Sequence, residues 1–238
     1  DPYFRHYKDT IGEFYWLPRD VFRLGTGEET DDDQLTVISI GFPQTVNTKK
    51  DQRNAADMPS ERWLYTRGEW EKLIFRISSD IVECLKDHGV QAVSLDSIRA
   101  FSRQTSPKFG MASNWSHRHT AFIAGLGTFG LSDGLITEKG KAMRFTTIII
   151  KGNVEPTVRP YGDHHAYCKF YTENRCGACI ARCPVKAITR DGHDKERCSD
   201  YLEKIKHEIG PDFVRNSEYI SGCGLCQSKV PCQDRIPK

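Results

Sequence analysis

The stretch Cys176-Gly-Ala-Cys179-Ile-Ala-Arg-Cys183-Pro184 is the most informative part of this 238-residue sequence. Its three thiols are separated by two and then three residues, and gaps this short let several thiolates converge on one inorganic centre. The alternative is a disulfide framework, which is typical of small secreted chains with a signal peptide, and this sequence has neither property. The spacing therefore predicts a metal site.

The other cysteines extend this site. The chain has nine cysteines, and all but Cys84 lie between residues 168 and 232. Eight thiols divide into two sets of four, and in bacterial ferredoxin-type runs the cysteine before proline ligates the other cluster. This crossover predicts two 4Fe-4S clusters, the first held by Cys168, Cys176, Cys179 and Cys232, and the second by Cys183, Cys198, Cys223 and Cys226.

Zinc is the competing metal, because Cys-x2-Cys pairs also build tetrahedral structural sites. The ending Cys183-Pro184 and the Val-Lys-Ala-Ile that follows are ferredoxin-like, and glycine or alanine beside the paired cysteines lets backbone amides approach inorganic sulfides. We therefore expect iron-sulfur clusters and one-electron transport. Few large apolar side chains follow residue 168, so the metal sites are expected to supply much of this region's folding energy.

Composition narrows the class of protein. With 38% hydrophobic and 28% charged residues, the chain has enough apolar material for one large domain or two small ones. The 34 basic and 32 acidic residues give a formal net charge of +2, which offers no basic field for a polyanionic partner. No window approaches the roughly 18 consecutive apolar residues of a spanning helix, so we expect a soluble, cytoplasmic protein without a membrane partner.

The residues before the cysteine region predict a mixed helical and strand domain. Apolar positions recur at three- and four-residue steps over residues 69–88, which predicts a long amphipathic helix ending near Gly89, with Cys84 as a free core cysteine. A second helix is predicted over residues 115–124. Strands are predicted over residues 35–42, 90–95, 135–137 and 144–151, the last two joined by a turn at residues 138–140. Residues 153–163 are expected to form a linker.

A glycine-rich turn, Gly125-Leu-Gly127-Thr-Phe-Gly130, matches the G-x-G-x-x-G pattern of dinucleotide-binding folds. A true fingerprint follows a strand and opens a helix, whereas these glycines follow a predicted helix and lead into strand-like residues. Two other interpretations stay open. The glycines either cap the helix and form tight turns, or they let the backbone press against another bulky cofactor.

Three motifs together carry a resemblance to a known family: Arg118-His-Thr-Ala-Phe-Ile-Ala-Gly-Leu-Gly-Thr-Phe-Gly130, the Cys-x2-Cys-x3-Cys-Pro run, and Gly222-Cys-Gly-Leu-Cys-Gln227. Over roughly residues 110 to 232 the chain resembles epoxyqueuosine reductases and the catalytic subunits of reductive dehalogenases. The resemblance implies an α+β protein with a nitroreductase-like α/β domain at residues 1–160 and a ferredoxin-like domain with two 4Fe-4S clusters at residues 161–238. It also implies a base-off cobalamin in the first domain, contacted by Gly125, Leu126, Gly127 and Gly130.

On this resemblance we expect an iron-sulfur oxidoreductase. Its clusters would take electrons from an external donor of the ferredoxin or flavodoxin type and pass them to a corrinoid that reduces an unknown small-molecule substrate. The alternative is a corrinoid-free electron-transfer or reductive-activator protein that serves a partner enzyme, and a flavin is a further candidate for the first domain. No catalytic residue is assigned.

Two departures from the family bear on the substrate. Residues 110–117 lack the acidic residue that epoxyqueuosine reductases carry there as a proton donor, and no helical-repeat extension of the tRNA-binding kind follows Cys232. We therefore do not expect tRNA as a partner.

Overall fold

The computed structural model describes residues 1–209 and 222–238 and divides the chain into two compact units. The first unit comprises residues 1–41, 73–125 and 145–160, and the second comprises residues 42–72, 126–144 and 161–238. Helices and strands occur in both, so the structure belongs to the mixed class that the sequence predicts. The second unit includes two segments from before residue 160, and the division of the chain into domains at that residue stays a prediction.

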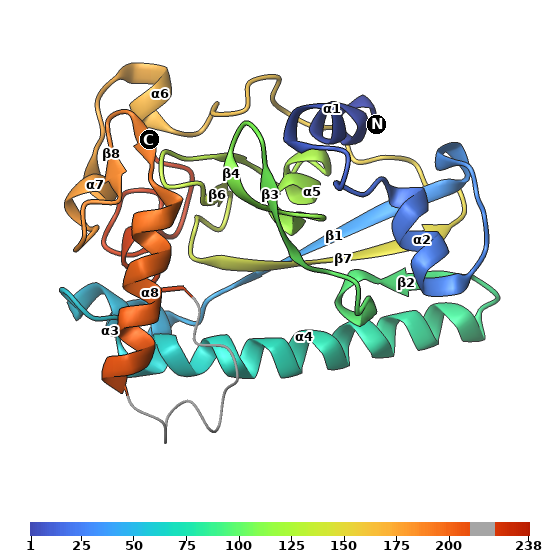
Figure 1. Ribbon diagram of the computed structural model, residues 1–238, viewed down its shortest axis with the longest axis horizontal. Coiled ribbons are helices and arrows are strands. Elements are labelled where there is room, and N and C mark those ends of the chain that lie inside the picture. Colours follow the sequence, from blue (N-terminus) through green and yellow to red (C-terminus); the bar gives the residue numbers. More distant parts are fainter. Residues whose placement is uncertain (210–221) are drawn as a thin grey trace. The chain divides into compact units, whose positions relative to one another are not determined.

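The first unit contains a three-stranded sheet in the order β1 (Leu35–Pro43), β7 (Met143–Lys151) and β2 (Ala92–Ser94) (Figure 1). Strand β2 pairs antiparallel with β7, with Val93 opposite Ile149. Every residue of the run 145–150 is buried, because β7 is the central strand and both of its faces are covered. Its dense β-branched residues suit that position, and the strands predicted over residues 35–42, 90–95 and 144–151 are confirmed.

The first unit also contains an aromatic cluster. Trp115 is 1% exposed and stacks with Phe4 and Tyr15 at ring-centroid distances of 5.7 and 6.3 Å. The other elements of this unit, besides part of a long helix, are α1 (Pro2–Ile11), α2 (Pro18–Thr26), η1 (Asp32–Gln34), η2 (Leu95–Ser97), the antiparallel pair β3 (Arg103–Ser106) and β4 (Gly110–Ser113), and α5 (His117–Ile123). Helix α5 confirms the helix predicted over residues 115–124.

The long amphipathic helix is α4 (Glu61–Asp87), which begins well before the predicted start at residue 69 (Figure 1). The prediction that Cys84 is a core residue is wrong, because its side chain is exposed. The buried stripe of α4 passes through Ile74 and Ser78, four residues apart, and Cys84 lies off this stripe. Gly89 has a left-handed φ of 76° and ends the helix as expected.

The second unit consists of short elements. Strand β5 (Gly127–Phe129) pairs antiparallel with β6 (Leu135–Thr137), so the two strands predicted on either side of the turn at residues 138–140 have different partners. The other elements are α3 (Val46–Asn54), the first part of α4, α6 (Lys169–Glu173), α7 (Ala178–Ala181), β8 (Ile188–Thr189), β9 (Gly192–His193), α8 (Lys195–Ile209) and η3 (Leu225–Gln227). Across the described parts of the chain, no helix has the length and apolar character needed to cross a membrane.

Candidate iron-sulfur site

All eight predicted ligands lie in the second unit, on short helices and the loops beside them. Cys168 precedes α6, Cys179 lies in α7, Cys198 in α8 and Cys226 in η3. Cys176, Cys183, Cys223 and Cys232 lie on the adjoining loops. All of these cysteines are free thiols in the structure, as is Cys84.

The four cysteines of the first predicted set line one cavity. The cavity holds about 380 Å³ of space that no atoms fill, including its open mouth, and its walls include Cys168, Cys176, Cys179 and Cys232. The pKa of Cys179 is raised to about 11, chiefly by burial; Lys141 opposes the rise, and negative charge on Cys226, Cys232 and Cys168 adds to it. The four thiols of this set are therefore gathered around one space, as the ligands of a single centre would be.

The second predicted set forms another neighbourhood. The pKa of Cys223 is raised to about 12, chiefly by burial; a hydrogen bond from the Leu225 backbone opposes the rise, and negative charge on Cys226, Cys198 and Cys183 adds to it. Burial likewise raises the pKa of Cys226; Lys141 opposes this rise, and negative charge on Cys198 and Cys183 adds to it. The structure thus brings these four thiols within electrostatic reach of one another. The backbone N–H of Ala187 donates a hydrogen bond to the Cys183 sulfur at 3.2 Å.

A buried lysine connects the two neighbourhoods. Lys141 is 3% exposed, and its ammonium donates to Ser132 Oγ at 3.0 Å and hydrogen-bonds to Cys232. Burial works against its charge and is the largest single effect on its pKa, but the cysteines Cys232, Cys226 and Cys179 together outweigh burial and raise the pKa. No local sequence pattern indicates this residue, because nothing distinguishes one buried lysine among 34 basic residues.

Residues 42–72 brace the cysteine loops. Gln52 is fully buried and donates to the Cys223 carbonyl at 2.7 Å, and the Trp63 indole N–H donates to the Gly222 carbonyl at 3.0 Å. Arg182, next to the predicted ligand Cys183, donates to the carbonyls of Ala55 and Ser228. These contacts join segments far apart in the chain, so no motif within the cysteine region could have indicated them.

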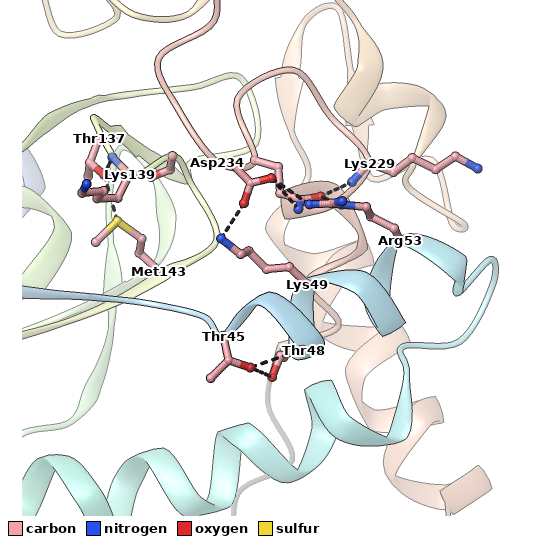
Figure 2. Close-up of polar contacts among 11 residues, drawn as sticks. Thr45, Thr48, Lys49, Arg53, Thr137, Lys139, Met143, Lys229 and Asp234 are labelled. Carbon is pink, nitrogen blue, oxygen red and sulfur yellow. Dashed lines mark hydrogen bonds and ion pairs between the residues drawn. The ribbon is translucent and has the colours of Figure 1, made fainter.

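A second brace holds the segment that contains Cys232. Figure 2 shows Lys49 and Arg53 of α3 directed at Asp234, with N–O distances of 2.5 and 2.8 Å. The Arg53 guanidinium also donates to Gln233 Oε1 at 3.1 Å, and that same oxygen accepts from the backbone of Lys229. These ion pairs from α3 hold Asp234, which lies two residues after the last predicted ligand, Cys232.

The space beside Gly125 and Gly127 in the glycine-rich turn is filled by the chain's own backbone. Gly125 has a φ of 82° just after α5, and a Cβ there would lie 3.3 Å from the Arg159 Cα. A Cβ on Gly127 would lie 2.2 Å from the carbonyl oxygen of Ile136, because β5 pairs with β6 at this point. The turn leads into a strand, as the sequence predicts, and both glycines are explained by internal packing.

Among the described residues, no three His, Cys, Asp or Glu side chains converge on the position of a single metal ion.

A family model described as "4Fe-4S double cluster binding domain" matches residues 174–232. Two curated relatives are named epoxyqueuosine reductase. The protein from Leadbetterella byssophila is 33% identical over 110 residues, 45% of this chain and 34% of the relative, and that from Atelocyanobacterium thalassa is 26% identical over 129 residues, 52% of this chain and 38% of the relative. The chain thus spans little more than a third of the length of these relatives.

Solved structures are also similar to parts of this chain. The structure of epoxyqueuosine reductase from Streptococcus thermophilus is similar over 95% of this chain and 55% of its own, with a TM-score of 0.50 and 16% sequence identity. A crystal structure of epoxyqueuosine reductase with a tRNA-Tyr epoxyqueuosine-modified tRNA stem loop is similar over 91% of this chain and 56% of its own, with a TM-score of 0.44 and 19% identity.

The curated relatives correct two expectations. The expectations that tRNA is not a partner and that the substrate is an unknown small molecule are contradicted, because these relatives are named epoxyqueuosine reductase and an epoxyqueuosine reductase has been solved with an epoxyqueuosine-modified tRNA stem loop. The two departures from the family on which the first expectation rested do not exclude tRNA. The resemblance itself is confirmed: the chain is similar to epoxyqueuosine reductases and contains a 4Fe-4S double cluster binding domain.

Proposed function

We propose that this chain is an iron-sulfur oxidoreductase of the epoxyqueuosine reductase type, in which two 4Fe-4S clusters relay single electrons. The observation that carries the proposal is the grouping of eight thiols into two neighbourhoods of four, each drawn from both ends of the cysteine region. The proposed sets are Cys168, Cys176, Cys179 and Cys232 for one cluster, and Cys183, Cys198, Cys223 and Cys226 for the other.

The protein's own groups would hold and shield these clusters. Bound clusters supply one-electron transfer, and their potential depends on net charge, hydrogen bonds to sulfur and exposure. Cys168 and Cys179 are each 8% exposed, so water has little access to that side of the first set. Gln52 and Arg182 fix the backbone beside the second set, which keeps the thiols near the geometry that a cluster requires.

Cobalamin as the electron acceptor is the finer part of the proposal and rests on the family resemblance, as does a nitroreductase-like fold of the first domain. The glycine turn does not support it: Gly125 and Gly127 pack against the chain's own backbone and leave no open cradle where a Cβ would stand. Internal packing explains both glycines without a corrinoid, so we derive no step through that group. Corrinoid contact by Gly125, Leu126, Gly127 and Gly130 stays a prediction.

The substrate class included in the proposal is an epoxyqueuosine-modified tRNA stem loop, because that molecule accompanies a relative in its solved structure. An external one-electron donor of the ferredoxin or flavodoxin type completes the proposal. The test incubates the protein and a chemical reductant with the modified stem loop, with and without added cobalamin. Mass spectrometry then measures removal of the epoxide oxygen. An unchanged stem loop in the presence of both would contradict this substrate.

The clusters are tested separately from the substrate. Anaerobically reconstituted protein is expected to contain about eight irons per chain. Cys183→Ser is expected to lose the cluster shared with Cys198, Cys223 and Cys226 and to keep about four irons. Iron and sulfide analysis with electron paramagnetic resonance measures this, and Cys84→Ser, at an exposed cysteine outside both sets, is the control. Loss of the other cluster would show that the crossover is wrong, and bound zinc would contradict both sets.

A further inference from the structure

Lys141 is a cation enclosed among thiols. Its side chain is 3% exposed, and it lines the same cavity as Cys168, Cys176, Cys179 and Cys232. The ammonium bonds to Ser132 and to Cys232, and Ser132 in turn hydrogen-bonds to Cys226. A short polar chain thus runs from a ligand of one proposed cluster, through Lys141 and Ser132, to a ligand of the other.

The structure is shaped around this lysine. A Cβ on Gly134 would lie 2.7 Å from the Lys141 Cδ, so only glycine there leaves room for the aliphatic part of the lysine. The Lys141 backbone N–H donates to the Cys232 carbonyl at 2.8 Å, which ties the lysine directly to the ligand's own segment. Gly134 therefore leaves room for the Lys141 side chain, and the Cys232 segment holds the Lys141 backbone in place.

No carboxylate of the described residues lies within ion-pair distance of Lys141. Lys169, which lines the same cavity, has such a partner in Glu173 at 3.2 Å. Burying an ammonium without a counter-charge is costly. The negative charge that would compensate Lys141 is that of the cysteine thiolates and whatever they bind.

We propose that Lys141 is a fixed cation that stabilises the reduced state of the two clusters, acting directly at Cys232 and through Ser132 at Cys226. This inference rests on the proposed function. Reduction adds one electron to a cluster and makes it one charge more negative, with no bond formed or broken. A buried positive charge beside the ligands attracts the reduced form more strongly than the oxidised form and so raises the potential.

The test is an anaerobic redox titration of reconstituted protein, followed by electron paramagnetic resonance of the reduced clusters. Lys141→Met removes the charge and keeps a similar length. At the ambient potential where the wild type is half reduced, the variant is expected to show at least a tenfold lower ratio of reduced to oxidised cluster, which equals 59 mV for one electron. Lys139→Met is the matched control, because it removes an exposed lysine two residues away. Lys141→Arg, which keeps the charge, is expected to stay closer to the wild type.

The outcomes separate this inference from the function on which it rests. Wild-type protein that binds no clusters would contradict both. Two intact clusters whose potentials are the same in Lys141→Met as in Lys139→Met would contradict only the role of Lys141. If Lys141→Met loses iron, Lys141→Gln is titrated in its place, and loss of both clusters in both variants would assign Lys141 to assembly and overturn the proposal.

Discussion

Gly140 lies where even one added carbon atom would collide with the segment that contains Cys232. Its φ is 85°, and a Cβ there would lie 2.1 Å from the Gln233 carbonyl oxygen. The residue adjoins Lys141, whose backbone bonds to the segment that contains Cys232. A side chain at position 140 would therefore displace the backbone on which the last predicted ligand depends.

Gly140→Ala is expected to destabilise the protein by about 2–4 kcal/mol, because the left-handed backbone and the collision with residue 233 both oppose it. Gly89→Ala is the control: it has a similar φ of 76° but open space around the Cβ, and it is expected to cost about 1 kcal/mol. Urea unfolding of the reconstituted proteins measures both. Equal midpoints for the two variants would show that the contact with residue 233 carries no strain.

The first turn of α4 is the element that supports the loop between Cys223 and Cys226. Trp63 is completely buried there, and a Cβ on Gly224 would lie 2.1 Å from its indole ring. The same ring donates to the Gly222 carbonyl and receives the Arg144 guanidinium over its face at 5.6 Å. A helix end and a ligand loop are therefore packed as one assembly within the second unit.

Trp63→Phe is expected to lower stability by about 1–2 kcal/mol, because it removes a buried hydrogen bond and leaves unfilled volume. It should also speed the loss of iron from the second set to a chelator. Trp70→Phe, on the same helix and only partly buried, is the control. Absorbance during chelation and urea unfolding measure the two effects, and equal rates of iron loss in both variants would show that Trp63 does not support the loop.

Local sequence patterns predict the helices and strands of this chain better than they predict which elements pack against each other. The central strand β7 was predictable because its β-branched run is buried on both faces. The start of α4 was not, since Leu64 packs with Tyr201 and Ile205 of α8, and these partners lie outside any window of the helix itself. Cysteine spacing predicts the two proposed ligand sets, whereas no local pattern predicts the buried cation Lys141, because its burial depends on loops far apart in the chain.

At the scale of the whole molecule, cluster binding changes the sign of the charge. The formal net charge is +2, and each oxidised cluster with four thiolates contributes about −2, so two clusters give 2 − 4, about −2. The sequence pI of about 8.1 therefore describes the apoprotein alone.

Anaerobic isoelectric focusing is expected to show a lower pI for reconstituted protein than for apoprotein. Cys183→Ser, with one cluster left, is expected to shift about half as far in charge. An unchanged pI after iron loading would mean that the bound species does not carry the charge of two such clusters.

The discontinuous second unit also imposes an order on synthesis. Trp63 and the carbonyl of Gly222 that it contacts are separated by 159 residues. At translation rates of about 5–20 residues per second, Trp63 emerges from the ribosome roughly 8–32 s before that partner exists. Cys226 and Cys232, the last members of the two proposed sets, are synthesised later still, so neither set is complete until that part of the chain has been translated. Cluster insertion therefore waits for residues 226–232, and residues 42–72 remain without their final partners until then.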